Sequence, residues 1–336
     1  MNFPPLNNIP VKKKILRIIL LFIVILGATW LLGPKPDKPL LSTELPQVEV
    51  ELTDLAEWLW LENGHLTIKP GNESIIEWAD SIPAKTEYVI LYLHGFSASP
   101  MEGMPVARNV AQTMGMNLYA PLLYGHGLVT EDALIDMYPD SLWNSALRAF
   151  AVARLMGEKV IVMGTSTGGT LALNLAAEFD TEGLVLLSPN VRVNHDNAEL
   201  LHGPWGLQIA RLVVGEKHLD ITGKTEEYAK YWYTRYRLEG TVYLGALLNS
   251  TMQPETFQKI TEPVMIGAYY KDEEHQDPVV KVSAMHWMYD HLFSSKKEFV
   301  EFPYTENHVM CCYITSKDLE SVERECVRFL NELISE

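Results

Sequence analysis

Short apolar runs and amphipathic stretches alternate along the chain from Tyr88 to the C-terminus. Continuous apolar runs rich in β-branched and aromatic residues predict buried strands, and apolar residues spaced three and four apart predict helices. The expected strands are 88–95, 116–123, 159–164, 183–189, 263–270 and 297–302, and the expected helices are 103–114, 143–156, 168–179, 281–293 and 317–334. This alternation favours an α/β fold whose mostly parallel central sheet has helices on both faces.

Two stretches depart from this rhythm. Residues 190–258 are rich in tyrosine and tryptophan and lie between two expected strands, so we expect them to form an insert above the edge of the sheet. The insert is a candidate cap, or lid, over a pocket; alternatively, its aromatic rings pack a small core of their own. Residues 50–80 show a weaker pattern, typical of entry strands and a short helix.

The N-terminal segment is strongly apolar. Residues 18–33 carry no charge and follow three lysines and one arginine at positions 12–17. A helix of this length spans about 24 Å, close to the hydrocarbon thickness of a bilayer, and the preceding basic cluster predicts a cytoplasmic N-terminus. We therefore expect residues 1–33 to be a single-pass membrane anchor with the catalytic domain extracytoplasmic. The alternative is a cleaved signal peptide and a secreted protein.

The remaining chain reads as a proline-rich linker, 34–46, followed by one large domain, 47–336, that contains the insert. The chain has 336 residues and a formal net charge of −16. The first 33 residues carry +4, so the rest carries −20 and would repel nucleic acid. Three cysteines, two of them adjacent, are too few for a disulfide scaffold and wrongly spaced for zinc. Free core thiols are expected, with a bridge from Cys326 to one of the adjacent pair as the alternative.

The strongest motif is Gly-Thr-Ser-Thr-Gly-Gly at 164–169, which follows an expected strand and opens an expected helix. Glycines two residues before and two residues after Ser166 permit the sharp turn that presents its hydroxyl at a helix N-terminus. A phosphate-binding loop would need a lysine after these glycines, and none is present. The motif therefore predicts that Ser166 is a nucleophile.

A nucleophilic serine needs a base, and its expected place is between the last strand and the last helix. His308 occupies that gap. An earlier histidine begins His94-Gly95-Phe96, directly after the strand 88–95; its early place in the chain favours a role in ordering the loop.

These motifs, HGF, LYGHG, GTSTGG and a late NH, resemble the α/β-hydrolase superfamily in order and spacing over roughly residues 85–335. Within it the chain is similar to esterases, monoglyceride lipases and serine aminopeptidase-like hydrolases. The resemblance implies a Ser-His-Asp triad and an oxyanion hole formed by the backbone N–H groups of Phe96 and Thr167. It also implies no metal or organic cofactor.

The triad acid has two candidates in this sequence. Asp272 directly follows the strand 263–270, and Asp277 opens an Asp-Pro-Val-Val turn that resembles those of family acids. Pro278 would stiffen that turn and the two valines would anchor it in the core, which favours Asp277 and leaves Asp272 as the alternative.

The expected function is a serine hydrolase that cleaves carboxylic esters, in the manner of a carboxylesterase or lipase, through an acyl-enzyme. The expected partners are a small-molecule or lipid ester and the membrane that holds the N-terminal helix. One alternative is a peptidase or amidase with the same triad, and another is a non-catalytic binding protein with a hydrolase fold. The sequence leaves the oligomeric state open.

Overall fold

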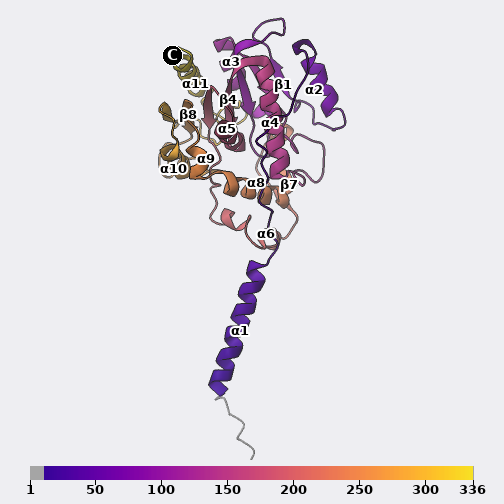
Figure 1. The fold of residues 1–336 in the computed structure, drawn as a ribbon, viewed down its shortest axis with the longest axis vertical. Coiled ribbons are helices and arrows are strands. Elements are labelled where there is room, and N and C mark those ends of the chain that lie inside the picture. The colour runs from indigo at the N-terminus through magenta and orange to yellow at the C-terminus, as the bar shows by residue number, and fades with distance from the viewer. Residues whose placement is uncertain (1–10, 336) are drawn as a thin grey trace, which may run out of the picture.

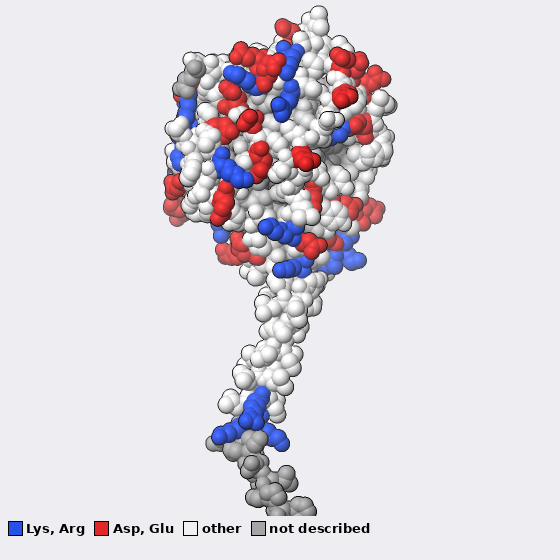
Figure 2. Space-filling view, viewed as in Figure 1, with Lys and Arg blue, Asp and Glu red and all other residues white. Residues whose placement is uncertain are grey.

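The structure, a computed structural model, describes residues 11–335. Helix α1 (Val11–Leu31) projects from a rounded body that contains all the other elements (Figure 1). Its apolar stretch, Lys13–Leu31, is 19 residues long and is not buried in the protein. Basic side chains gather at its free end, and its shaft is uncharged (Figure 2). By length and composition this helix could cross a membrane or serve as a signal sequence.

The body is built on one seven-stranded sheet with the order β1-β3-β2-β4-β5-β8-β9. Its strands are β1 (Ile75–Glu77), β2 (Thr86–Leu93), β3 (Asn117–Ala120), β4 (Gly157–Thr165), β5 (Gly183–Leu187), β8 (Val264–Ala268) and β9 (Lys297–Glu301). Strand β1 is antiparallel to β3, and every other neighbouring pair is parallel. Strand β3 is shorter than expected because Pro121, which has no N–H to donate to a ladder, follows it directly.

Helices cover both faces of this sheet and create two hydrophobic cores. In β4, Val160 and Val162 face one core, whereas Ile161 and Met163 face the other. The first core lies under α4, α5 and α10, and the second lies under α3 and α11. The helices of the body are α2 (Leu55–Asn63), α3 (Val106–Met114), α4 (Pro139–Met156), α5 (Thr167–Glu178), α10 (Val282–His291) and α11 (Leu319–Ile334), with 3-10 turns at Leu52–Asp54 and Pro100–Gly103. The mostly parallel sheet with helices on both faces confirms the predicted fold class.

The segment between β5 and β8 leaves the sheet and forms an insert at the end of the body next to α1 (Figure 1). Its elements are a 3-10 turn (Ala198–Leu200), α6 (Gly206–Val214), the antiparallel pair β6 (His218–Asp220) and β7 (Arg235–Arg237), α7 (Glu226–Tyr231), α8 (Leu238–Thr251) and α9 (Pro254–Phe257). Trp232 joins one core of the body, and Tyr233 and Tyr236 join the other. The buried rings of the insert therefore pack against the body rather than only against each other.

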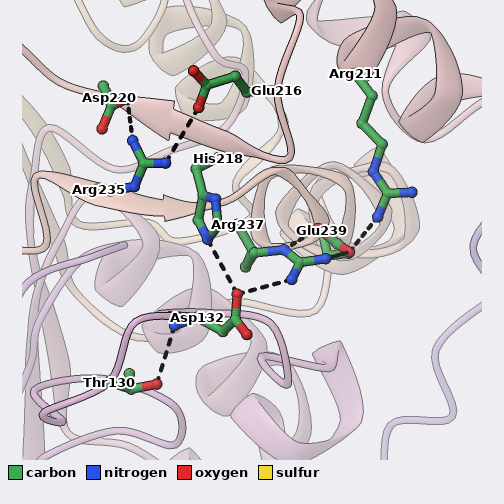
Figure 3. A network of polar contacts seen from close by, with 9 residues as sticks. All are labelled: Thr130, Asp132, Arg211, Glu216, His218, Asp220, Arg235, Arg237 and Glu239. Carbon is green, nitrogen blue, oxygen red and sulfur yellow. Dashed lines mark hydrogen bonds and ion pairs between the residues drawn. The ribbon is translucent and has the colours of Figure 1, made fainter.

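Polar side chains also join the insert to the body (Figure 3). Arg237 binds Asp132, in the segment between β3 and α4, at 2.8 Å, and it binds Glu239 of α8 at 2.6 Å. Arg211 of α6 reaches the same Glu239 carboxylate at 2.6 Å. Asp132 also accepts a contact from His218 at 3.1 Å. One carboxylate of the body thus contacts both strands of the small β6–β7 pair.

Candidate active site

Ser166 occupies the sharp turn between β4 and α5. Its backbone has φ 55° and ψ −119°, a conformation that is costly for a residue with a side chain. The turn is fixed on both sides, because the Ser166 N–H donates to the Leu187 carbonyl at 3.1 Å and its own carbonyl accepts the Asn190 N–H at 2.9 Å. Strand β5 and the segment after it therefore hold this strained turn in place.

The glycines of the motif are required by close backbone contacts. A Cβ on Gly168 would lie 1.8 Å from the Leu93 carbonyl oxygen, and a Cβ on Gly164 would lie 2.6 Å from the Gly168 carbonyl. A Cβ on Gly95 would lie 3.0 Å from the Cβ of Ser166. The absence of these side chains lets β2, β4 and the start of α5 approach each other around the serine.

His308 lies in the loop between β9 and α11 and pairs with Asp277. The imidazole Nδ1 is 2.7 Å from Asp277 Oδ2, and both side chains are buried. The other carboxylate oxygen, Oδ1, accepts the backbone N–H groups of Val279 and Val280 at 2.8 and 3.0 Å. Backbone N–H groups of its own loop therefore hold Asp277 in place, and Nε2 of His308 is left for another partner.

Asp272, the other candidate acid, lies elsewhere. Its side chain is half-exposed and contacts Nδ1 of His275 at 2.7 Å. Residues 270–276 form a small closed excursion, because Tyr270 pairs with Gln276 and the Asp277 N–H donates to the Tyr269 carbonyl. The excursion returns the chain to the end of β8, so Asp277 stands where a residue directly after the strand would stand.

Burial and the attraction between His308 and Asp277 shift the pKa of each group in opposite directions. Burial by itself raises the pKa of Asp277, but the His308 charge, its hydrogen bond and the two valine N–H groups outweigh burial and hold that pKa below the ordinary value. Burial by itself lowers the pKa of His308, but attraction to Asp277 outweighs it and raises that pKa. The arrangement therefore stabilises an imidazolium ion, which a general base becomes when it takes a proton.

Phe96 and Thr167, the two expected oxyanion donors, flank the serine. Phe96 directly follows Gly95, which packs on Ser166, and Thr167 is the first residue of α5. Within residues 11–335 neither backbone N–H has a hydrogen-bond partner, and the buried Thr167 hydroxyl has none either. Unpartnered donors next to a nucleophile are available for a developing negative charge.

Both ring nitrogens of His94 make contacts that hold this loop. Its Nδ1 faces the Gly95 carbonyl oxygen at 2.9 Å, and its Nε2 accepts the Leu123 N–H at 3.0 Å. This pattern defines a neutral tautomer with the proton on Nδ1. Burial and the neighbouring His126 lower the pKa of His94 well below its ordinary value. Its geometry is that of a loop support, with no nitrogen free to act as a base.

Glu102 is a buried carboxylate that sequence reasoning missed. It lies in the 3-10 turn after the HGF loop and is only 2% exposed. Its Oε2 accepts the Gly95 N–H at 2.5 Å and the Tyr92 hydroxyl at 3.3 Å. Burial raises its pKa to about 7, against the lowering effects of the Gly95 N–H and of His308. The available signal was an isolated acid in an otherwise small and apolar stretch, SASPMEGMPV.

Two kinds of chemistry find no support among the described residues. Residues 11–335 contain no group of three histidine, cysteine, aspartate or glutamate side chains placed to hold a metal ion. The three cysteines are free and buried, and burial raises the pKa of Cys311 and of Cys312 to about 12. A thiol with such a pKa is a poor nucleophile at neutral pH.

Comparisons with known proteins agree with the fold described above. A model of the alpha/beta hydrolase family matches residues 90–310. A solved structure from work on LipS and LipT, two metagenome-derived lipolytic enzymes, superposes with a TM-score of 0.65 at 18% identity and covers 79% of this chain and 100% of that one. Est1E from Butyrivibrio proteoclasticus, with ferulic acid bound, superposes with a TM-score of 0.54 at 19% identity, covering 79% and 96%. A search of curated proteins found no significant match.

Proposed function

The chain belongs to the alpha/beta hydrolase family, and we propose that it cleaves carboxylic esters with Ser166 as nucleophile, His308 as base and Asp277 as the acid that orients the base. The observation that carries the proposal is the buried His308–Asp277 pair, with 2.7 Å between Nδ1 and Oδ2. It accompanies a serine held in strained backbone at a helix N-terminus. Such strain is retained where surrounding contacts fix it, and it is common at active sites.

The proposed reaction has two halves. The Nδ1 proton of His308 is held by Asp277, so Nε2 takes the proton of the Ser166 hydroxyl as its oxygen attacks the ester carbonyl. The N–H groups of Phe96 and Thr167 stabilise the oxyanion. His308 then protonates the departing alcohol, leaving an acyl group on Ser166. Water, deprotonated by His308, attacks that acyl group and releases the acid and the free enzyme.

Esters with a hydrophobic acyl part are the proposed substrates. The insert buries the rings of Trp232, Tyr233 and Tyr236 against the body, and Phe96 packs edge-on against Tyr236 with 5.2 Å between ring centroids. One structural neighbour comes from work on two lipolytic enzymes, and another is Est1E with ferulic acid bound. These features favour an ester-cleaving enzyme with an apolar acyl site under its cap.

Helix α1 is proposed to anchor this activity at a membrane. Basic side chains lie at its N-terminal end, and the body follows its C-terminal end, so the positive-inside rule predicts an extracytoplasmic body. The alternative is a signal peptide that is removed. N-terminal sequencing of the mature protein separates the two, because a start after about residue 30 would show cleavage.

The central experiment combines covalent labelling with a substrate panel. A fluorophosphonate probe should label the wild-type protein, and Ser166→Ala should lose the label and about 10⁶-fold in kcat while its circular dichroism and melting temperature stay unchanged. Hydrolysis of p-nitrophenyl esters without hydrolysis of aminoacyl anilides is expected. Preference for the anilides would replace the esterase with a peptidase, and absence of labelling in the wild type would indicate a non-catalytic protein.

A further inference from the structure

Helix α6 of the insert lies beside α1 and forms an apolar groove with it. Leu26, Thr29 and Trp30 of α1 form one wall of an apolar groove. The other wall comes from the insert and consists of Trp205, Gln208, Ile209 and Leu212. Trp205 also fastens the two parts together, because its indole N–H donates to the Thr29 carbonyl at 3.1 Å and its backbone N–H donates to the Pro34 carbonyl at 2.7 Å.

The length of α1 determines how deep in a bilayer this groove would lie. Its 19-residue apolar span measures about 28 Å, which is close to the hydrocarbon thickness of a bilayer of about 30 Å. A spanning α1 therefore needs almost its whole length inside the bilayer, including Leu26 and Trp30. Leu26 lies about 7.5 Å along the helix axis before Leu31. A helix that packs beside Leu26 must then lie in the outer part of the same leaflet.

The surface of α6 is suited to that position. Leu212 and Val213 are 82% and 79% exposed, and Val214 and the nearby Leu200 are also exposed. Arg211 of the same helix fastens α6 to α8 of the insert, through a contact with Glu239 at 2.6 Å. Figure 2 shows basic side chains, with acidic ones among them, at the edge of the body next to α1, where lipid phosphates would lie.

We propose that α6 docks in the outer leaflet of the bilayer that α1 crosses, so that the insert over Ser166 rests on the membrane surface. This inference depends on the proposed anchor and goes beyond it, since an anchor alone leaves the orientation of the body free. An interfacial helix typically lies about 5–10 Å deep, in agreement with the position beside Leu26. The docked insert would open the site toward lipid esters in the same leaflet.

A depth measurement on the full chain in vesicles tests this proposal. Because the three native cysteines are buried, a fluorescent NBD label can be placed on a single new cysteine in Val213→Cys. The matched control is Ile82→Cys, 71% exposed in the segment before β2, at the opposite edge of the sheet. In phosphatidylcholine–phosphatidylglycerol vesicles, lipids with a spin label near the headgroup should quench the label at 213 and leave the label at 82 unaffected.

The outcomes separate the two proposals. Flotation of the protein with the vesicles, with equal quenching at both positions, would overturn the docking of α6 and leave the anchor intact. Failure to float would overturn the anchor and the docking together. Quenching at 213 alone, with flotation, is the expected result.

A different observation, the position of Glu102, carries a second inference about the proposed reaction. Its carboxylate accepts the N–H of Gly95, the residue between His94 and the proposed donor Phe96, and it faces Ser166 across the bare Gly95 Cα. The same carboxylate oxygen accepts the Tyr92 hydroxyl of β2 at 3.3 Å. The oxyanion loop and β2 are thus joined through one buried side chain.

We infer that Glu102 is a positioning residue, which fixes the Gly95 peptide so that the Phe96 N–H stays directed at the substrate carbonyl. The inference rests on the proposed serine mechanism. The charge of Glu102 is felt by titratable groups on every element around it. These groups are Tyr92 of β2, Tyr228 of α7, and His308, Cys311 and Cys312 of the loop after β9.

Two substitutions separate the hydrogen bond of Glu102 from its charge. Glu102→Gln keeps an oxygen that can accept the Gly95 N–H but removes the charge, so most of kcat should remain. The acidic limb of the kcat/KM profile should then move to lower pH, because the Glu102 charge raises the pKa of His308. Glu102→Ala removes both, and kcat should fall toward the 10²–10³-fold loss that one oxyanion donor causes, with little change in KM.

A purely structural role gives a different result. Both variants would then have lower melting temperatures, while the folded enzyme would keep the wild-type kcat and pH profile, and the inference would be overturned. If Glu102→Ala does not fold, the pH profile of Glu102→Gln still decides. Loss of all fluorophosphonate labelling in the wild type would instead remove the proposed mechanism itself.

Discussion

The carboxyl edge of the sheet and the insert above it hold their polar side chains in different ways. At the sheet edge, the strained Ser166 and the buried Asp277 are fixed by backbone N–H and carbonyl groups. In the insert, much of the polar attachment runs through long side chains such as Arg237, whose partner Asp132 is half-exposed (Figure 3). Backbone contacts fix geometry, whereas ion pairs near the surface are screened by salt. The residues of the proposed chemistry are thus held by backbone hydrogen bonds, whereas the insert adds ion pairs to the rings that it buries against the body.

The largest expected difference concerns the two aspartates near β8. Asp277→Asn should lower kcat by about 10⁴, because it removes the group that holds the imidazole tautomer. Asp272→Asn should have little effect on kcat, since this half-exposed side chain binds only within its own excursion. Steady-state kinetics on purified, folded variants checks the ranking. Equal losses would mean that the excursion moves into the site and that the sheet edge is less rigid than described.

A pair of glycine substitutions compares the rigidity of the two regions directly. Gly168→Ala would place a Cβ 1.8 Å from a backbone oxygen at the sheet edge, so we expect a loss of about 3 kcal/mol or more in the free energy of unfolding. Gly245→Ala, within α8 of the insert, meets its nearest atom at an ordinary 3.5 Å and should stabilise by up to about 1 kcal/mol. Urea titrations measure both values. A well-tolerated Gly168→Ala would contradict the tight packing around the serine.

The pH dependence of the wild-type enzyme tests the electrostatics at the sheet edge. His308 must be neutral to act as a base, and its pKa lies above the ordinary 6.5 because attraction to Asp277 outweighs burial. Activity should therefore fall as pH drops, with a kcat/KM midpoint above 6.5 and about a tenfold loss per unit below it. A pH series with a soluble acetate ester is sufficient. A midpoint well below 6.5 would mean that burial dominates.

The smallest expected effect belongs to the insert. Arg237→Gln removes the contacts to Asp132 and to Glu239, and we expect a loss of about 1–2 kcal/mol in stability. Because Arg211 still binds Glu239, the insert should stay folded but become more sensitive to proteases. Limited proteolysis with mass spectrometry locates the new cuts, which should fall within residues 190–258. Cuts in the body alone would show that these ion pairs do not hold the insert.

The sequence was informative where a physical requirement of the fold can be met by only one kind of residue pattern. The fold class followed from uninterrupted apolar strands such as 159–164, which a two-sided parallel sheet requires. The glycines around Ser166 predicted the sharp turn, because only glycine fits where two backbone segments lie in such close contact. The role of this serine, and those of His308 and Asp277, stay predictions that the experiments above test.

Other features depend on contacts between residues that are not adjacent in the chain, which the order of residues does not show. The Asp-Pro-Val-Val turn already favoured Asp277 over Asp272, but the pairing of Tyr270 with Gln276, which closes the excursion, left no mark in the sequence. For Glu102 the sequence offered only an isolated acid in SASPMEGMPV, a weak signal, because its importance comes from three-dimensional neighbours in β2 and the HGF loop. Only the fold could show that the insert's aromatic rings pack against the body.

The three buried cysteines have a consequence for where this protein can work. With a pKa of about 12, only about one in 10⁵ of the Cys311 or Cys312 thiols is ionised at pH 7, and ionised thiols are the species that oxidants and disulfides attack. Cys326 is equally buried and unpaired. The folded body therefore needs neither an oxidising environment to build cross-links nor a reducing one to protect its thiols. The stability of the folded body should therefore not depend on the redox potential on either side of a membrane.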